Sequence, residues 1–138
     1  MPRIRGVRGE MVLVRSRDVS FKRPIRLLHP RWPIYVVPRD EGVLMIGATM
    51  LESDNDGPIT LRSAVELLSA AVALHPALAE AEIIEMGANL RPALPDNLPD
   101  VTREGRVVRF SGLYRHGFLL APAYSLRAAQ LLEPMDPT

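Results

Sequence analysis

The sequence contains no cysteine, and only 5% of its 138 residues are aromatic. Without cysteine the chain can form neither a disulfide framework nor a zinc ribbon, and thiol catalysis is excluded. No apolar run approaches the roughly 18 residues that a membrane-spanning helix requires, and no signal-peptide core follows the N-terminal arginines. We therefore expect a cytoplasmic protein that has no membrane partner.

Short catalytic motifs are missing as well. The three histidines, His29, His75 and His116, lie far apart in sequence and lack the spacing of metal ligands, so no metal site is expected. The sequence has no GxSxG, HExxH or P-loop motif, and it has no GxGxxG dinucleotide fingerprint. The remaining candidates for a binding site are arginines in unusual settings.

Positive charge is concentrated near the N-terminus of a chain whose formal net charge is only +1. Ten of the 17 basic residues lie in the first 39 positions, which hold only two acidic residues, Glu10 and Asp18. The arginines are spaced singly through strand-like sequence, without interleaved aromatic residues or a nucleic-acid-binding motif. We expect a solvated or anion-facing edge here, and no nucleic-acid partner.

The stretch from Ile34 to Met50, IYVVPRDEGVLMIGATM, predicts two strands joined by the turn Asp40-Glu41-Gly42. The glycine supplies the positive φ that a three-residue hairpin loop needs. Pairing across this turn places Tyr35 opposite Gly47, which leaves room for another group against the tyrosine ring. A plain core hairpin is the alternative interpretation.

Sequence periodicity predicts the other elements. The first helix runs from about Thr60 or Ser63 to His75, capped by one of these two residues, and the second from Pro122 to Leu132. We expect the apolar stripe of the first helix to comprise Leu61, Ala64, Val65, Leu68, Ala71 and Val72. We expect strands from about Val7 to Arg15, Glu82 to Leu90 and Val107 to Ser111, an irregular segment from Asp18 to Pro33, and loops from Leu51 to Pro58 and Pro92 to Pro99.

These elements predict an α+β fold, with a mixed, largely antiparallel sheet and two main helices packed on one side. The length and a hydrophobic content of 47% are enough for a real core. The 13 prolines favour many interrupted elements over a few long ones.

Two arginines stand in settings suited to binding an anion. Arg91 precedes Pro92, which favours an extended backbone, so its guanidinium would be aimed from a fixed position at a carboxylate. Arg115 lies between Gly112 and Gly117, where the backbone can approach a ligand closely. A solvated arginine at a strand end and a plain loop before a helix are the respective alternatives.

Three motifs occur in order, IYVVPRDEGVLMIGATM, GANLRPALPD and SGLYRHGFLLAP. Each resembles a motif in the C-terminal half of the FAD-dependent D-amino-acid oxidase and glycine oxidase family, and most of all the glycine oxidases of thiamine (thiazole) biosynthesis. The resemblance covers the chain from Val7 to Leu132. It implies the fold of the C-terminal half of a glycine oxidase-like flavoenzyme, with FAD as cofactor and a small amino acid or amine as substrate.

The resemblance also implies roles for individual residues. Tyr35 would hydrogen-bond the substrate carboxylate, Arg91 would form the salt bridge to it, and Arg115 would lie beside substrate and flavin. Met50 would line the pocket, although strict alternation along its strand places it on the face opposite Tyr35. The residues that would wrap the flavin ring are Gly112, Leu113, Tyr114, Arg115, His116, Gly117, Phe118 and Leu119. The flavin carries out the redox step, so no side chain of this chain is assigned as a catalytic group.

The chain departs from the family pattern at several positions. Asn89 stands where the family has glycine, Leu113 replaces a histidine, and His116 replaces an asparagine. These changes keep open a second hypothesis, a non-catalytic binding or assembly module derived from an oxidase.

The GxGxxG domain that family members use to bind FAD has no counterpart in this sequence. We therefore expect a truncated or C-terminal fragment, in which residues 1–95 form a substrate-binding sheet domain and residues 96–138 belong to the FAD domain. Alone, it would neither retain FAD tightly nor oxidise amines, and its partner would be the missing N-terminal FAD-binding half. Exposed apolar surface would favour a homo-oligomer.

Overall fold

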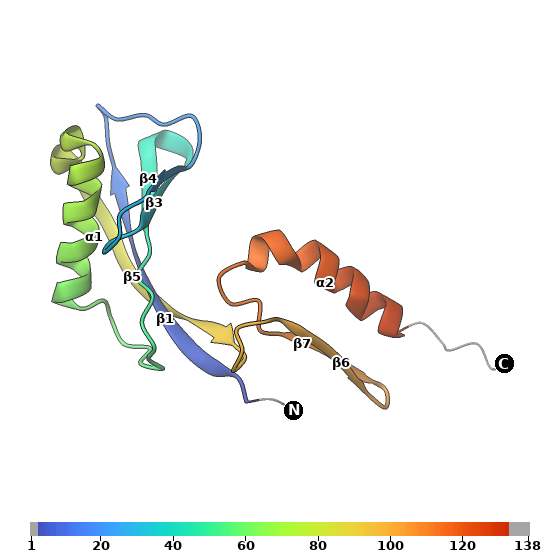
Figure 1. Cartoon of the computed structure of the whole chain (residues 1–138). Coiled ribbons are helices and arrows are strands. Elements are labelled where there is room, and N and C mark those ends of the chain that lie inside the picture. The colour runs from blue at the N-terminus through green and yellow to red at the C-terminus, as the bar shows by residue number, and fades with distance from the viewer. Residues whose placement is uncertain (1–2, 133–138) are drawn as a thin grey trace. The chain divides into compact units, whose positions relative to one another are not determined.

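The computed structural model describes residues 3–132. In this part of the chain, strands and α-helices follow one another with two short 3₁₀ turns (Figure 1). In chain order the elements are β1 (Arg5–Arg15), β2 (Ile25–Leu27), β3 (Ile34–Pro38), η1 (Asp40–Gly42), β4 (Val43–Gly47), α1 (Leu61–Leu74), η2 (Pro76–Glu80), β5 (Glu82–Ala93), β6 (Asp100–Glu104), β7 (Val107–Ser111) and α2 (Gly117–Leu132).

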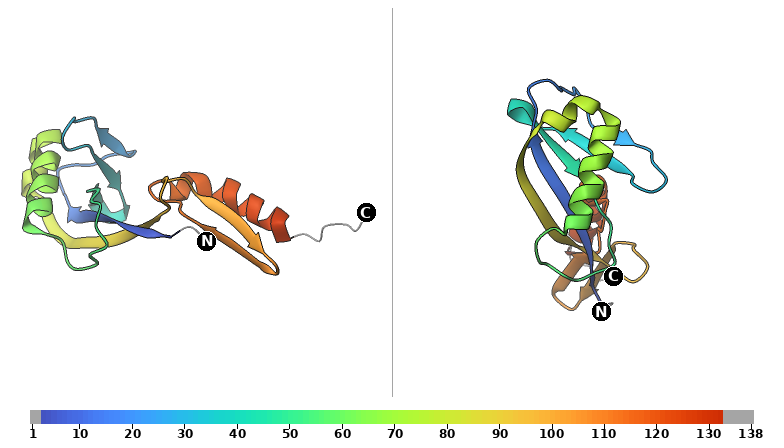
Figure 2. Two further views of the ribbon diagram at one scale, coloured as in Figure 1. Left: turned by 60° about the horizontal axis from the view of Figure 1, so that its bottom comes forward. Right: turned by 90° about the vertical axis from the view of Figure 1, so that its left-hand side faces the viewer.

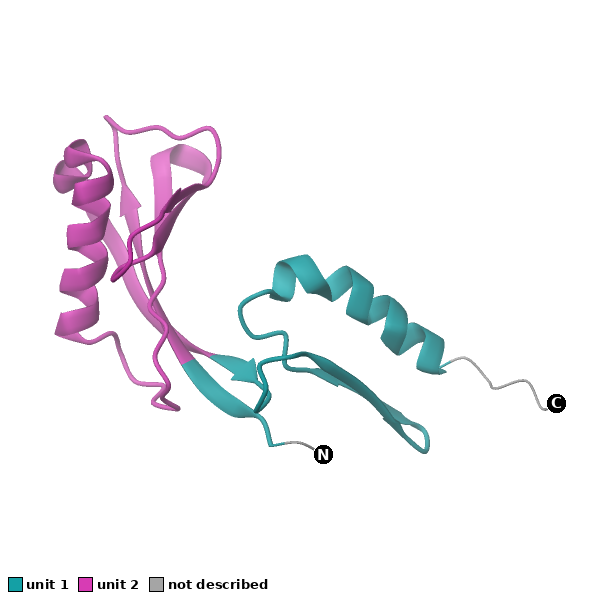
Figure 3. Cartoon of the chain, viewed as in Figure 1, with its two compact units in different colours: residues 1–7, 91–138 teal, residues 8–90 magenta. Residues whose placement is uncertain are grey.

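The chain divides into two compact units (Figure 3). One, the sheet unit, comprises residues 8–90, and the other, the hairpin–helix unit, comprises residues 1–7 and 91–138. The functional boundary expected near residue 95, between a substrate-binding domain and a flavin domain, stays a prediction. No helix of the described residues is long and apolar enough to cross a membrane.

A five-stranded sheet in the order β2-β3-β4-β1-β5 is the main architectural element. The pairs β1–β4, β3–β4 and β2–β3 are antiparallel, and β6 and β7 form a separate antiparallel hairpin. In the sheet unit, α1 lies against one face of the sheet (Figure 2). The α+β fold with two main helices and largely antiparallel strands is therefore confirmed.

The core lies between α1 and the sheet, because alternate residues of each strand point to the same face. Valine, isoleucine and leucine side chains of β1, β3 and β4 meet small residues of the helix. The buried cluster contains Val12, Val14, Ile34, Val36, Leu44 and Ile46 from the strands, and Leu67, Ala70 and Ala71 from α1.

The central hairpin has the predicted register. Tyr35 pairs with Gly47 and Val37 pairs with Met45. The turn is closed by a hydrogen bond from the Arg39 N–H to the Val43 carbonyl oxygen at 2.8 Å. Gly42 has a φ of 72°, as the loop length requires.

The first helix begins at the earlier of its two predicted caps. The Oγ1 atom of Thr60 accepts a hydrogen bond from the Ser63 N–H at 3.2 Å, which satisfies a donor of the first turn. The predicted apolar stripe is partly wrong, because Leu61 is 83% exposed and Val65 and Val72 are also exposed. The buried side is instead made mainly of small residues, which let the helix approach the sheet closely, namely Ser63, Ala64, Leu67, Ala70 and Ala71.

Two short strands were not predicted. β2 lies within the segment expected to be irregular, and β6 lies just after the proline-rich loop. That loop is also shorter than predicted, because β5 continues through Pro92 to Ala93. β5 is the last strand in the sheet order, and an edge position tolerates a residue that has no N–H to donate.

The second helix begins at Gly117, five residues before the predicted start. The Leu120 N–H already donates to the His116 carbonyl oxygen at 2.8 Å. Pro122 therefore lies inside the helix and removes one backbone hydrogen bond without ending it.

The helix α2 packs on the β6–β7 hairpin within its own unit. The rings of Phe110 and Tyr124 stack with centroids 5.7 Å apart. The Arg103 guanidinium donates to the Leu131 carbonyl oxygen at 2.7 Å. No residue of the helix is fully buried, and Phe118 at its start is completely exposed.

Candidate functional site

The Tyr35 ring lies directly on Gly47. A Cβ atom added at Gly47 would stand 3.2 Å from the Cε2, Cζ and hydroxyl oxygen of Tyr35, closer than most Cβ contacts. The tyrosine ring itself therefore fills the space left by the missing side chain. The sequence had suggested that this space would hold another group, and that prediction is wrong. Gly47 therefore lets the ring fold down while 37% of the tyrosine remains exposed.

Two further residues share a row across the sheet with this pair. Arg26 on β2 pairs with Tyr35, and Met11 on β1 pairs with Gly47. Directly paired residues point to the same face, so all four side-chain positions lie on the face opposite α1, here called the Tyr35 face. Sequence reasoning missed Arg26, because β2 is only three residues long and shows no periodicity.

Met50 also lies on the Tyr35 face, because the register between β1 and the chain after β4 shifts by one residue. Met11 pairs with Gly47, whereas Arg8 forms a bridge with Leu51. Two residues separate the first pair from the second on β1, but three separate them on the other segment. Such an irregularity reverses which face the following side chains point to. Strict alternation predicted that Met50 faces away from Tyr35, and the shift places it on the same face instead.

The side chain of Thr49 supports this orientation of its neighbour. Its Oγ1 atom donates to the Oε2 atom of Glu10 at 2.9 Å, on the α1 side of the sheet. Leu51, which pairs with Arg8, points to the same face as Thr49 because the two are two residues apart. Met50, between them, therefore points the other way, and it is exposed.

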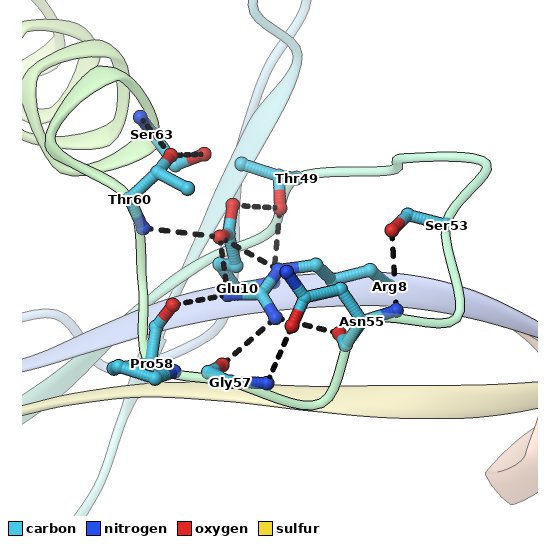
Figure 4. A network of polar contacts seen from close by, with 9 residues as sticks. All are labelled: Arg8, Glu10, Thr49, Ser53, Asn55, Gly57, Pro58, Thr60 and Ser63. Carbon is cyan, nitrogen blue, oxygen red and sulfur yellow. Dashed lines mark hydrogen bonds and ion pairs between the residues drawn. The ribbon is translucent and has the colours of Figure 1, made fainter.

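Arg8 and Glu10 form a buried ion pair beneath this segment (Figure 4). Only 3% of Arg8 and none of Glu10 is exposed. The Arg8 Nε atom donates to the Glu10 Oε1 atom at 2.9 Å. The other guanidinium nitrogens donate to backbone carbonyl oxygens of the loop before α1, those of Asn55, Gly57 and Pro58, at 2.6, 2.8 and 2.5 Å.

The Glu10 carboxylate is held by donors from several directions. Burial alone would raise its pKa, but hydrogen bonds with Ser63, Thr49 and Arg8, together with the Thr60 N–H, outweigh that effect. The pKa of Glu10 therefore lies below its ordinary value, and the group is a carboxylate at neutral pH. From the sequence this segment is predicted only as a strand from about Val7 to Arg15, and no motif there indicates the ion pair.

Arg91 lies within β5, two residues before its end, and is half-buried. Its neighbour Pro92 accepts a hydrogen bond from the Tyr114 N–H at 3.2 Å. The predicted carboxylate-binding arginine and the predicted flavin loop are thus adjacent in the hairpin–helix unit. Tyr35 and Met50 belong to the sheet unit.

The sequence suggested unusual backbone conformations at the glycines of the loop from Gly112 to Gly117. Of these glycines, Gly112 has a positive φ. Its φ is 81°, and a Cβ there would stand 2.7 Å from the Cγ of Leu94, so any other residue would strain the backbone and displace Leu94. Tyr114 also has a positive φ, of 51°. The side chains of Arg115 and His116 are exposed at the end of the loop.

The family model described as FAD dependent oxidoreductase matches residues 1–131 of the chain. This chain belongs to that family. It is 61% identical over 132 residues to a protein of Rhizobium etli that is named thiamine biosynthesis oxidoreductase ThiO. The match covers 96% of this chain and 40% of that protein. It is 32% identical to the glycine oxidase of Pseudomonas aeruginosa, covering 95% of this chain and 36% of that enzyme.

Solved structures of the FAD-dependent oxidoreductase family share the fold. The glycine oxidase of Bacillus cereus superimposes with a TM-score of 0.80 at 33% identity, over 92% of this chain and 35% of that one. The glycine oxidase of Geobacillus kaustophilus gives a TM-score of 0.82 at 27% identity, over 98% and 37%. The predicted family is confirmed, and the chain spans about 40% or less of the length of these relatives.

Proposed function

We propose that this chain is the substrate-binding part of an FAD-dependent oxidoreductase that oxidises glycine or another small amino acid in thiamine (thiazole) biosynthesis. The observation that carries the proposal is the Tyr35 ring lying on Gly47, which directs a hydroxyl donor onto the face opposite α1. The similarity to ThiO and to glycine oxidases supports the assignment of the substrate class.

In this proposal the substrate carboxylate is bound by two groups of the chain. The Tyr35 hydroxyl donates one hydrogen bond to it, and the Arg91 guanidinium forms a bidentate ion pair with it. Arg115 lies beside substrate and cofactor, and Met50 lines the pocket where the α-substituent lies. Two such donors would orient the α-carbon, and orientation of this kind accounts for much of the rate enhancement in two-substrate reactions.

The loop Gly112–Leu119 is proposed to lie along one edge of the flavin ring. The first intrahelical hydrogen bond of α2 comes from Leu120, so the N–H groups of Gly117, Phe118 and Leu119 are not engaged in the helix ladder. The first turn of α2 contains no acidic residue that would compete for them. The positive end of the helix would favour a flavin oxygen that carries negative charge.

When bound, FAD would accept a hydride from the substrate α-carbon and pass the electrons to oxygen, giving an imine and hydrogen peroxide. This chain would hold the carboxylate at Tyr35 and Arg91 and present the α-carbon toward the flavin. It offers no dinucleotide-binding motif, so we propose that FAD is retained only when an N-terminal FAD-binding part is present. Alone, the chain is expected to be inactive.

The test is complementation. The purified chain is mixed with FAD and with the FAD-binding part of the Rhizobium etli relative, chosen for its 61% identity. A bound flavin spectrum and glycine-dependent peroxide are expected from the mixture and from neither component alone. A mixture that gives no bound flavin and no peroxide with any small amino acid contradicts the proposal.

A non-catalytic binding or assembly module is the second candidate. Exposed apolar side chains on α2 favour it, because a helix surface of this kind is suited to bind another protein or a second copy of the chain. Either form of the protein is proposed to act in the cytoplasm and to self-associate. Assembly without any bound flavin would favour this candidate over the oxidase.

A further inference from the structure

The backbone on each side of Met50 is hydrogen-bonded to β1, to Glu10 on one side and to Arg8 on the other. On one side, the Thr49 N–H donates to the Glu10 carbonyl oxygen at 3.2 Å. On the other, Leu51 and Arg8 exchange two backbone hydrogen bonds, at 2.9 and 3.0 Å. The residue between them has little freedom to turn its side chain away from the Tyr35 face.

The hydroxyl of Thr49 connects this segment to the buried ion pair. It accepts a hydrogen bond from the Glu10 N–H at 2.9 Å and donates one to the Glu10 Oε2 atom, also at 2.9 Å. Arg8 holds the carboxylate from the other side and also binds the loop that leads into α1. Thr49 therefore has one defined orientation.

A buried ion pair is a poor way to gain stability, because the cost of removing both charges from water offsets most of their attraction. An apolar pair of similar size would fill the same space at no greater cost. What charged groups add here is directionality, since each hydrogen bond accepts only a narrow range of angles. The arrangement suits a requirement for one exact geometry of the segment above it.

We propose that Arg8, Glu10 and Thr49 are positioning residues of the substrate site. They hold the Met50 side chain on the Tyr35 face and so fix how much space it leaves for the substrate. The inference rests on the proposed function, because it assigns a role to Met50 in binding the amino-acid substrate. It predicts that loosening this network weakens the binding of a small substrate while leaving the rate of the bound complex nearly unchanged.

The test compares Thr49→Val with Thr49→Ser. Valine keeps the shape of threonine and loses both hydroxyl hydrogen bonds, whereas serine keeps the hydroxyl, so Thr49→Ser is the matched control. Amide hydrogen exchange is measured on the full chain. We expect the Glu10 and Leu51 amides to exchange roughly tenfold faster in Thr49→Val only. The Val36 and Ile46 amides in the central hairpin should be unaffected.

The same variants are then assayed in the complemented complex. In Thr49→Val the KM for glycine is expected to rise by about tenfold with kcat within about twofold, and Thr49→Ser should resemble the unchanged chain. Equal KM values for the two variants in an active complex overturn this inference and leave the proposed function standing. So does faster exchange of all amides by one factor, which indicates a general loss of stability. If the unchanged chain forms no active complex, both the proposed function and this inference are overturned. The exchange data then report only whether Thr49 restrains the backbone on either side of Met50.

Discussion

Tyr35 and Gly47 face each other across the β3–β4 hairpin, and the missing side chain of the glycine lets the tyrosine ring lie close against the backbone of β4. The contact is close enough that one added methyl group would press against the ring and its hydroxyl. The position of the hydroxyl therefore depends on a residue that has no side chain.

Gly47→Ala should move the tyrosine ring. The new Cβ would stand 3.2 Å from three ring atoms, so we expect a loss of about 1–2 kcal/mol in the free energy of unfolding, as for overpacked sites. The KM for glycine in the complemented complex should also rise. Gly87→Ala is the matched control, because its Cβ would meet the Met11 methyl at an ordinary 3.6 Å. Chemical denaturation of both variants provides the measurement, and equal stabilities would argue against the close contact.

The stability of the chain should depend on the ionisation of Glu10. Its pKa in the folded protein is lowered from 4.5, so the unfolded chain binds more protons in this range and stability rises with pH. The contribution is fully present above about pH 4.5 and is lost as the pH falls through the lowered pKa. Urea denaturation at a series of pH values measures this effect.

Glu10→Gln removes the titrating group from the same network. At pH 7 it should destabilise the chain by on the order of 3 kcal/mol, because Arg8 is left buried without a carboxylate. The difference between the two proteins should shrink in acid. Glu80→Gln, at an exposed position, is the control. A difference that stays constant from neutral pH to about pH 3 would rule out this role for Glu10.

The chain alone should self-associate through α2. Leu126 is 62% exposed on a helix without a buried residue, and burying one leucine is worth roughly 1.5–3 kcal/mol. Leu126→Glu should therefore weaken association by at least about tenfold, as measured by light scattering over a range of concentrations. Ser125→Glu adds the same charge at an exposed position about 100° around the helix from Leu126 and should have less effect. A strictly monomeric unchanged chain would refute the prediction.

The sequence predicted the hairpin well, because its turn chemistry and alternation determine the register. Tyr35 opposite Gly47 followed directly from the three-residue turn. The motifs indicated the family for the same reason, since they are local in sequence.

Features that depend on tertiary packing could not be predicted in this way. Leu67 and several small residues face the sheet from α1, while the larger apolar residues Leu61, Val65 and Val72 are exposed, because tertiary packing decides which side of the helix is buried. The one-residue shift before Leu51 lies beside the Arg8–Glu10 network, which joins segments some 40 to 50 residues apart. No local pattern reveals such a connection. The candidate roles of Tyr35, Arg91, Arg115 and Met50 stay predictions.

If this chain anchors the carboxylate of an amino-acid substrate, Arg91→Gln should change the KM for glycine in the complemented complex. Losing a bidentate ion pair should raise KM by roughly 100-fold. Arg106→Gln, which removes an arginine from the exposed β6–β7 turn, should leave it within about twofold. Arg91→Gln should thus have a far higher KM than Arg106→Gln, and equal KM values for the two variants would rule out a carboxylate anchor at Arg91.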